Sequence, residues 1–142
     1  MAAPSSHVAC CYDGSPASEA AVAEGRRLVG SDDGRLSVIH VYHDPPLYGG
    51  MYVPDLGAVR DSARTWYAEK AAAWPGAEAV FLEGAPTVEI DRWAEQAHPD
   101  LMISGIHHGP TRRAVLGSVT SHLLHHAPCP VLVVRAPHED ED

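Results

Sequence analysis

Residues whose side chains suit phosphate binding gather in one stretch near the end of the chain, 104–135, which reads SGIHHGPTRRAVLGSVTSHLLHHAPCPVLVVR. Glycine lets a backbone approach a ligand with no Cβ atom in the way. A helix that begins at Gly117-Ser118 would direct free N–H groups and a partial positive charge toward an anion. The Ser118 hydroxyl would add a donor, and Arg112 and Arg113 would add positive charge. Together these residues describe an anion site.

The same residues also have a plain structural interpretation. The glycines would only shape a turn, Ser118 would only cap a helix, and the two arginines would face solvent. Glycine spacing by itself is a weak signal. The residues alone therefore leave a phosphate loop and a simple turn as alternatives.

Asp13 is a second candidate, because it follows the apolar run HVACCY (7–12) and opens the turn DGSP. A carboxylate there does not favour phosphate, but it can accept hydrogen bonds from a ribose or a base. Its alternative role is that of a turn residue or a helix cap. The motif does not decide between the two.

Alternating apolar strands and helices must position these residues. The pattern predicts five strands, 7–12, 35–42, 77–84, 100–105 and 130–135, and four helices, 17–29, 56–70, 85–97 and 118–127. The core side of the helices is expected to carry Ala17, Ala21, Gly25, Leu28, Val59, Ala63, Trp66, Ile90, Trp93, Ala94, Ala97, Val119, Leu123 and Ala127. Lys70 continues the period of the second helix, whose last turn is expected to be exposed.

This alternation predicts one α/β domain, residues 1–137, with a parallel sheet and helices on both faces, followed by a disordered acidic tail, 138–142. Such sheets bind ligands at the carboxyl ends of their strands. The candidate site loops are therefore 13–15, the segment from Val41, and 105–118. The loop 43–55 either folds over this site or is an ordinary surface loop.

Composition excludes several classes of function. The net charge of −9 and the single lysine argue against nucleic-acid binding. No apolar run is long enough to span a membrane, and the N-terminus lacks the features of a signal peptide, so a cytoplasmic location is expected. The three cysteines are expected to be buried free thiols. His122 and His126 have the i, i+4 spacing of metal ligands, but no carboxylate or cysteine at ligand spacing is evident beside them, which favours an exposed helix face and no metal site.

Two stretches carry a resemblance to a known family. VACCYDGSPASEAAV near the start and LGSVTSHLLHHAPCPVLVVR at the end resemble the signature segments of universal stress proteins, and EGAPTVEI resembles the family's segment after the third strand. The resemblance implies a Rossmann-like, adenine nucleotide alpha hydrolase-like fold with a five-stranded parallel sheet of order 3-2-1-4-5. It also implies a homodimer formed through strand 130–135.

Many members of the family bind ATP through a glycine, two residues, a second glycine, nine residues, and then Gly-Ser or Gly-Thr. Here Gly105 matches the first position and Gly117-Ser118 the last, whereas His108 stands at the second and Gly109 comes one residue late. The segment between the outer glycines is one residue shorter than the pattern. His107 and His108 could replace the lost backbone contact with imidazole donors. Adenine would meet the backbone at Val41.

The resemblance thus implies a cytoplasmic stress-response protein that binds an adenine nucleotide, expected to be ATP with Mg²⁺, and acts as a sensor or regulator rather than an enzyme. The expected nucleotide-binding residues are Asp13, Gly14, Ser15, Val41, Gly105, His107, His108, Gly109, Arg112, Arg113, Gly117, Ser118 and Val119. The first alternative is a dimeric interaction module that binds no nucleotide. The second is a slow phosphohydrolase or nucleotidyl transferase that uses His107 or His108.

Overall fold

The computed structural model describes residues 6–30, 33–44, 55–108 and 114–136, and at 107, 108, 114 and 115 it describes the backbone alone. The expected tail 138–142 and most of the loop 43–55 lie outside these residues. The elements in chain order are β1 His7–Cys11, α1 Pro16–Val29, β2 Arg35–Tyr42, α2 Leu56–Ala71, β3 Glu78–Glu83, α3 Pro86–Ala97, β4 Leu101–His108, β5 Ala114–Val115, α4 Ser118–His126 and β6 Val131–Arg135.

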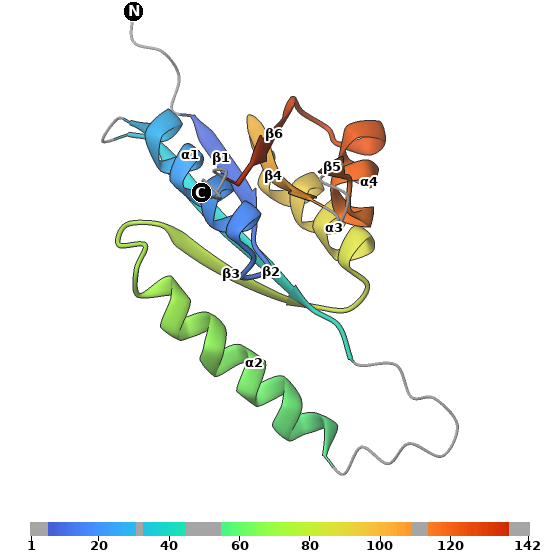
Figure 1. Ribbon diagram of the computed structural model, residues 1–142. Helices are drawn as coiled ribbons and strands as arrows, with labels where there is room; N and C mark the ends of the chain where they lie inside the picture. Colours follow the sequence, from blue (N-terminus) through green and yellow to red (C-terminus); the bar gives the residue numbers. More distant parts are fainter. Residues whose placement is uncertain (1–5, 31–32, 45–54, 109–113, 137–142) are drawn as a thin grey trace, which may run out of the picture.

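Five parallel strands form the sheet in the order β3-β2-β1-β4-β6 (Figure 1). This confirms the order 3-2-1-4-5 expected for the five predicted strands. β1 lies in the centre, where Val8 pairs with Leu36 on one side and with Leu101 on the other. The direction of strand order reverses between β1 and β4. Ligands of open α/β sheets bind at such a reversal.

Helices cover both faces of the sheet, as expected (Figure 1). Alternate strand residues point to opposite faces, so each face has its own core. The core beneath α1 and α2 contains Val8, Cys10, Tyr12, Ala21, Val22, Leu36, Val38, Tyr67, Trp74 and Ile103. The core beneath α3 and α4 contains Ala9, Ile39, Ile90, Ala94, Met102 and Leu123.

β4 is longer than the sequence predicts. Its expected end was residue 105, but β6 pairs with it from Met102 as far as Ile106, so Gly105 stays within the sheet. The next two residues, His107 and His108, then pair antiparallel with the short strand β5. The sequence placed Gly105 both at the end of the strand 100–105 and at the start of the site loop, and the structure supports the strand placement. At its two ends, the expected loop 105–118 contains paired strand residues.

Two helices bury a different set of residues from the one expected. In α1, Leu28 was expected inside but is 40% exposed, whereas Val22 is buried. In α2, Val59 is likewise 40% exposed, and Tyr67 is the one residue buried. Tyr67 is buried because its hydroxyl donates to the carbonyl of Val38 beneath the helix. α2 is thus held to the sheet mainly by its second half.

Candidate functional site

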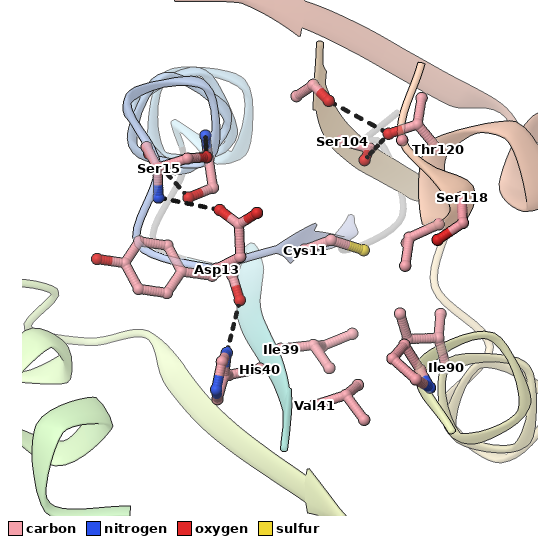
Figure 2. A pocket seen from close by; sticks show the side chains of 16 residues that line it. Cys11, Asp13, Ser15, Ile39, His40, Val41, Ile90, Ser104, Ser118 and Thr120 are labelled. Carbon is pink, nitrogen blue, oxygen red and sulfur yellow. Dashed lines mark hydrogen bonds between the residues drawn. The ribbon is translucent and has the colours of Figure 1, made fainter. Parts of the chain in front are cut away.

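A pocket of about 230 Å³ opens at the carboxyl ends of β1, β2 and β4, beside the reversal of strand order (Figure 2). It is lined by Cys11, Tyr12, Asp13, Ser15, Ser18, Ile39, His40, Val41, Pro86, Ile90, Ser104, Gly105, Gly117, Ser118, Val119 and Thr120. The helices that border it are α1, α3 and α4. Segments from both ends of the chain therefore meet in one cavity.

Seven of the expected site residues line this pocket. They are Asp13, Ser15, Val41, Gly105, Gly117, Ser118 and Val119. The residues expected from the sequence thus include residues of the pocket lining and the residues at the N-terminus of α4.

Gly14 does not line the pocket. Its φ of +85° is a left-handed conformation that side chains rarely adopt, and an added Cβ would lie 2.7 Å from Cζ2 of Trp66. Gly14 therefore serves the turn and its packing against α2. His107 and His108 belong to β4, where only their backbone is described. Gly109, Arg112 and Arg113 lie outside the described residues.

The turn after β1 is held by short-range hydrogen bonds. The backbone N–H of Ser15 donates to Oδ1 of Asp13 over 2.9 Å, and the Ser15 hydroxyl accepts from the N–H of Ser18 at the start of α1. Pro16 follows as the first helical residue, a position at which a backbone N–H would have no partner within the helix. Asp13 accordingly has the turn role that the sequence offered as an alternative, and its carboxylate still lines the cavity.

The N-terminus of α4 forms the opposite wall. Gly117 occupies the cap position with φ of −63° and ψ of 166°, and no side chain caps the helix. The first N–H groups of a helix have no partner within the helix. Among the residues that the structure describes, none has an atom within 4 Å of the place where a Gly117 Cβ would stand. A ligand can therefore approach this backbone closely, at an end that favours negative charge.

Glycine is required at position 105 by the packing of the fold. An added Cβ would lie 2.7 Å from the carbonyl carbon, the carbonyl oxygen and the Cβ of Ala17. Glycine is thus needed at 105 because the first turn of α1 lies directly on β4. This packing role differs from the loop role that the sequence suggested.

Hydroxyl groups on the pocket floor were missed by the sequence analysis. The Ser104 Oγ and the Thr120 Oγ1 lie 2.6 Å apart, and Thr120 also donates to the carbonyl of Gly105 over 3.2 Å. Ser104 follows three apolar residues of a predicted buried strand, and Thr120 falls in the first turn of a predicted helix. A polar side chain at a buried strand position was the signal that could have found Ser104.

Another side of the cavity is apolar. Ile39 and Ile90 are almost completely buried, at 1% and 3% exposure, and Val41 lies on the same side (Figure 2). Cys11 adds a thiol. Loss of hydration raises the pKa of that thiol to about 12, and the Asp13 carboxylate contributes in the same direction. The thiol is therefore neutral at ordinary pH.

His122 has a carboxylate partner that the sequence did not reveal. Its Nε2 lies 2.7 Å from Oδ2 of Asp91 on α3, and its ring centroid is 4.7 Å from that of His126. The expectation that no carboxylate lies nearby was wrong, because the partner comes from another helix. Within the described part of the chain, no group of three or more His, Cys, Asp or Glu residues is arranged to hold a metal ion.

The three cysteines, Cys10, Cys11 and Cys129, are free thiols. Cys10 is buried, and the other two are half-buried.

The sheet order and the position of the pocket define a Rossmann-like α/β protein with a pocket at the topological switch point. The model of the universal stress protein family matches residues 5–135, so the chain belongs to that family. A universal stress protein of Thermus aquaticus is 32% identical over 129 residues, covering 87% of this chain and 94% of the relative.

Solved structures agree with this assignment. Universal stress protein UspA from Lactobacillus plantarum has a TM-score of 0.66 and 27% identity, covering 94% of this chain and 100% of that one. A universal stress protein described in complex with cAMP has a TM-score of 0.59 and 21% identity, covering 93% and 98%. An Arabidopsis thaliana family protein described with AMP bound has a TM-score of 0.62 and 19% identity, covering 95% and 94%. The last two show likeness of fold.

Proposed function

We propose that this protein binds an adenine nucleotide, ATP with Mg²⁺, in the pocket at the end of β1, β2 and β4. The observation that carries the proposal is the start of α4, which has no side-chain cap and lines a cavity whose other side is apolar. An apolar slot beside free backbone N–H groups suits a ligand with a flat base and an anionic end. The solved relatives that hold AMP and cAMP support the adenine class.

Each part of the ligand has a complementary wall. The base would lie between Ile39, Val41 and Ile90, and the ribose would donate its hydroxyl protons to the Asp13 carboxylate. The phosphates would accept from the N–H groups at Ser118 and Val119. Asp13 is the one carboxylate among the lining residues. Mg²⁺ would therefore arrive coordinated mainly by the phosphates.

We infer that the protein acts by binding rather than by catalysis, as a cytoplasmic sensor or regulator. Among the lining residues, the one histidine is His40, and its Nδ1 makes a 2.9 Å hydrogen bond with the carbonyl of Tyr12. A general base needs an aligned nucleophile and a partner that orients it. A hydrolase or transferase that used His107 and His108 would instead show turnover that a double His→Ala variant loses.

Calorimetric titration of the purified protein with Mg-ATP tests the proposal, with AMP and cAMP titrated separately. A denatured sample is first checked for nucleotide carried through purification. We expect micromolar binding that Gly117→Glu abolishes, because the new carboxylate would occupy the phosphate position at the start of α4. Ser62→Glu is the matched control, since it adds the same charge at an exposed position of α2. Absence of binding, of carried nucleotide and of any thermal shift would contradict the proposal.

A dimeric interaction module that binds no nucleotide is the second candidate. The one-residue shortening between Gly105 and Gly117 favours it. It would keep the pairing of β6 between two copies and lose the ligand. The same titration separates the two candidates.

A further inference from the structure

The carboxyl end of β4 contacts the first turns of two helices, one on each face of the sheet. On one face, Gly105 lies directly against Ala17 of α1. On the other face, the Ser104 hydroxyl lies 2.6 Å from the Thr120 hydroxyl in the first turn of α4. Both helix starts line the pocket. This strand end therefore sets the distance between two walls of the cavity.

Thr120 is fixed by two hydrogen bonds (Figure 2). A threonine hydroxyl carries one proton, and Thr120 donates it to the Gly105 carbonyl. The Ser104 hydroxyl must then be the donor in the bond between the two side chains. Ser104 and Thr120 are 4% and 3% exposed. Because an unpaired buried hydroxyl is costly, this hydroxyl bridge favours a single arrangement of the two elements.

No other side chain in the described part of the protein is seen to restrain the start of α4 by a cap hydrogen bond. Gly117 stands at the cap position, where a Ser, Thr, Asp or Asn side chain would ordinarily accept from the N–H two or three residues on. A cap side chain of that type would occupy N–H groups that a ligand needs. The bridge from Thr120 to β4 restrains the same turn from the side facing the sheet, and so leaves those N–H groups available.

We propose that Ser104 and Thr120 are positioning residues, whose hydroxyl bridge holds the first turn of α4 in the orientation that binds the anionic end of the ligand. The inference rests on the proposed nucleotide site. N–H groups bind an anion only when they point at it within hydrogen-bond distance. A turn that can rotate or fray spends part of its time in other orientations, and the apparent affinity falls by that fraction.

The test compares Thr120→Val, Thr120→Ser and Ser104→Ala by two measurements. The first is the dissociation constant for Mg-ATP, and the second is the amide exchange rate of Ser121 in the protein without nucleotide, because the Ser121 N–H donates to the Gly117 carbonyl over 2.9 Å and exchanges when this turn opens. Valine keeps the shape of threonine but has no hydroxyl, so we expect about tenfold weaker binding or more, with faster exchange. Serine restores the hydroxyl, and we expect binding within about threefold of the original.

Leu123→Ala is the matched control. Leu123 is buried on the same helix and lies outside the pocket lining, so this variant loses core packing but keeps the bridge. We expect a lower melting temperature with the affinity for Mg-ATP nearly unchanged. Unchanged affinity in Thr120→Val, or an equal loss in Leu123→Ala, would overturn the inference. If Thr120→Val does not fold, Ser104→Ala makes the same comparison.

The two proposals fail in different ways. If the original protein binds no nucleotide, the proposed function falls, and with it the role of the bridge in binding. If the original protein binds and Thr120→Val binds equally well, only the positioning role falls. An exchange rate of the Ser121 amide that is the same with and without the Thr120 hydroxyl would show that the bridge does not restrain the turn, whatever the protein binds.

Discussion

Cys10 and Cys11 end β1 with thiols on opposite faces of the sheet. Cys10 belongs to the core beneath α1 and α2, whereas Cys11 lines the pocket. Loss of hydration raises the pKa of each thiol from 9.0 to about 12. A protonated thiol is a poor nucleophile. At the residue scale, the pocket therefore presents a neutral thiol, which agrees with a site that binds rather than reacts.

These raised pKa values make the stability of the protein sensitive to alkaline pH. Between about pH 9 and pH 12 the folded state keeps thiol protons that the unfolded state has lost, so the free energy of unfolding falls as pH rises. Full stability is expected below pH 9, with a loss of about 1 kcal/mol per thiol for each pH unit above it. Urea denaturation at several pH values between 8 and 10 measures this slope.

The double variant Cys10→Ala, Cys11→Ala is the control for that slope. Tyr12 and Tyr67 also have raised pKa values, chiefly because of burial, and the unfolded state starts to lose tyrosine protons near pH 10. Both proteins share this contribution, so the difference between their slopes reports on the thiols. The variant is less stable at every pH, but its stability should change less between pH 8 and pH 10. The same slope in both proteins would contradict the assignment to the thiols.

At the scale of elements, the helices differ in how firmly they are attached. α1 lies so close to β4 that Gly105 has no room for a side chain. α2 buries one residue, Tyr67, and presents Val59 to solvent. Local opening free energies follow such differences in burial. The pocket is bordered by the firmly attached α1 and by α3 and α4, whereas α2 lies outside its lining.

The close approach of α1 and β4 predicts that two glycine-to-alanine substitutions differ in their effect on the free energy of unfolding. Gly105→Ala would place a Cβ 2.7 Å from atoms of Ala17, and such overpacking costs about 1–3 kcal/mol. Gly117→Ala meets no atom of the described residues within 4 Å and has an ordinary φ, so its effect on stability should stay below about 1 kcal/mol. Urea denaturation of both variants measures the difference. Equal destabilisation would contradict a packing role for Gly105.

At the scale of the whole molecule, β6 is the feature that points to assembly. It pairs with β4 on one side and ends the described parallel sheet on the other. Its sequence, VLVVR, is apolar, and an exposed apolar edge strand invites pairing with another chain. We propose a homodimer in which the β6 strands of two copies pair antiparallel.

Among the described residues, no helix is long and apolar enough to cross a membrane.

Light scattering on a sizing column tests the dimer. Val133 lies at the centre of β6, so antiparallel pairing brings the two copies of this residue close together, and Val133→Glu would set like charges against each other. We expect the original protein to elute as a dimer and this variant as a monomer. Val88→Glu, at a position 50% exposed on α3, should remain dimeric. A dimeric Val133→Glu variant would place the interface elsewhere.

Features that follow from local residue patterns could be predicted from the sequence. The apolar runs located the five parallel strands, and the turn residues around Asp13 and Gly117 located two walls of the pocket. Contacts between elements that lie far apart along the chain were not predicted. Neither the packing of Gly105 on Ala17 nor the pair of Asp91 and His122 has a signal in the local spacing of residues. The two-residue strand β5 has no apolar period of its own and exists because β4 offers it an edge.

His107 pairs with Val115 and His108 pairs with Ala114, so the position of Gly117 depends on this ladder as well as on the number of residues between Gly105 and Gly117. Residues 109–113 connect two positions that the ladder already fixes side by side. α4 begins at Ser118, shortly after the ladder ends at Val115, so its start is tied to β4 through the ladder as well as through this connection. The number of residues counted along the motif is therefore not by itself a measure of the distance between Gly105 and Gly117.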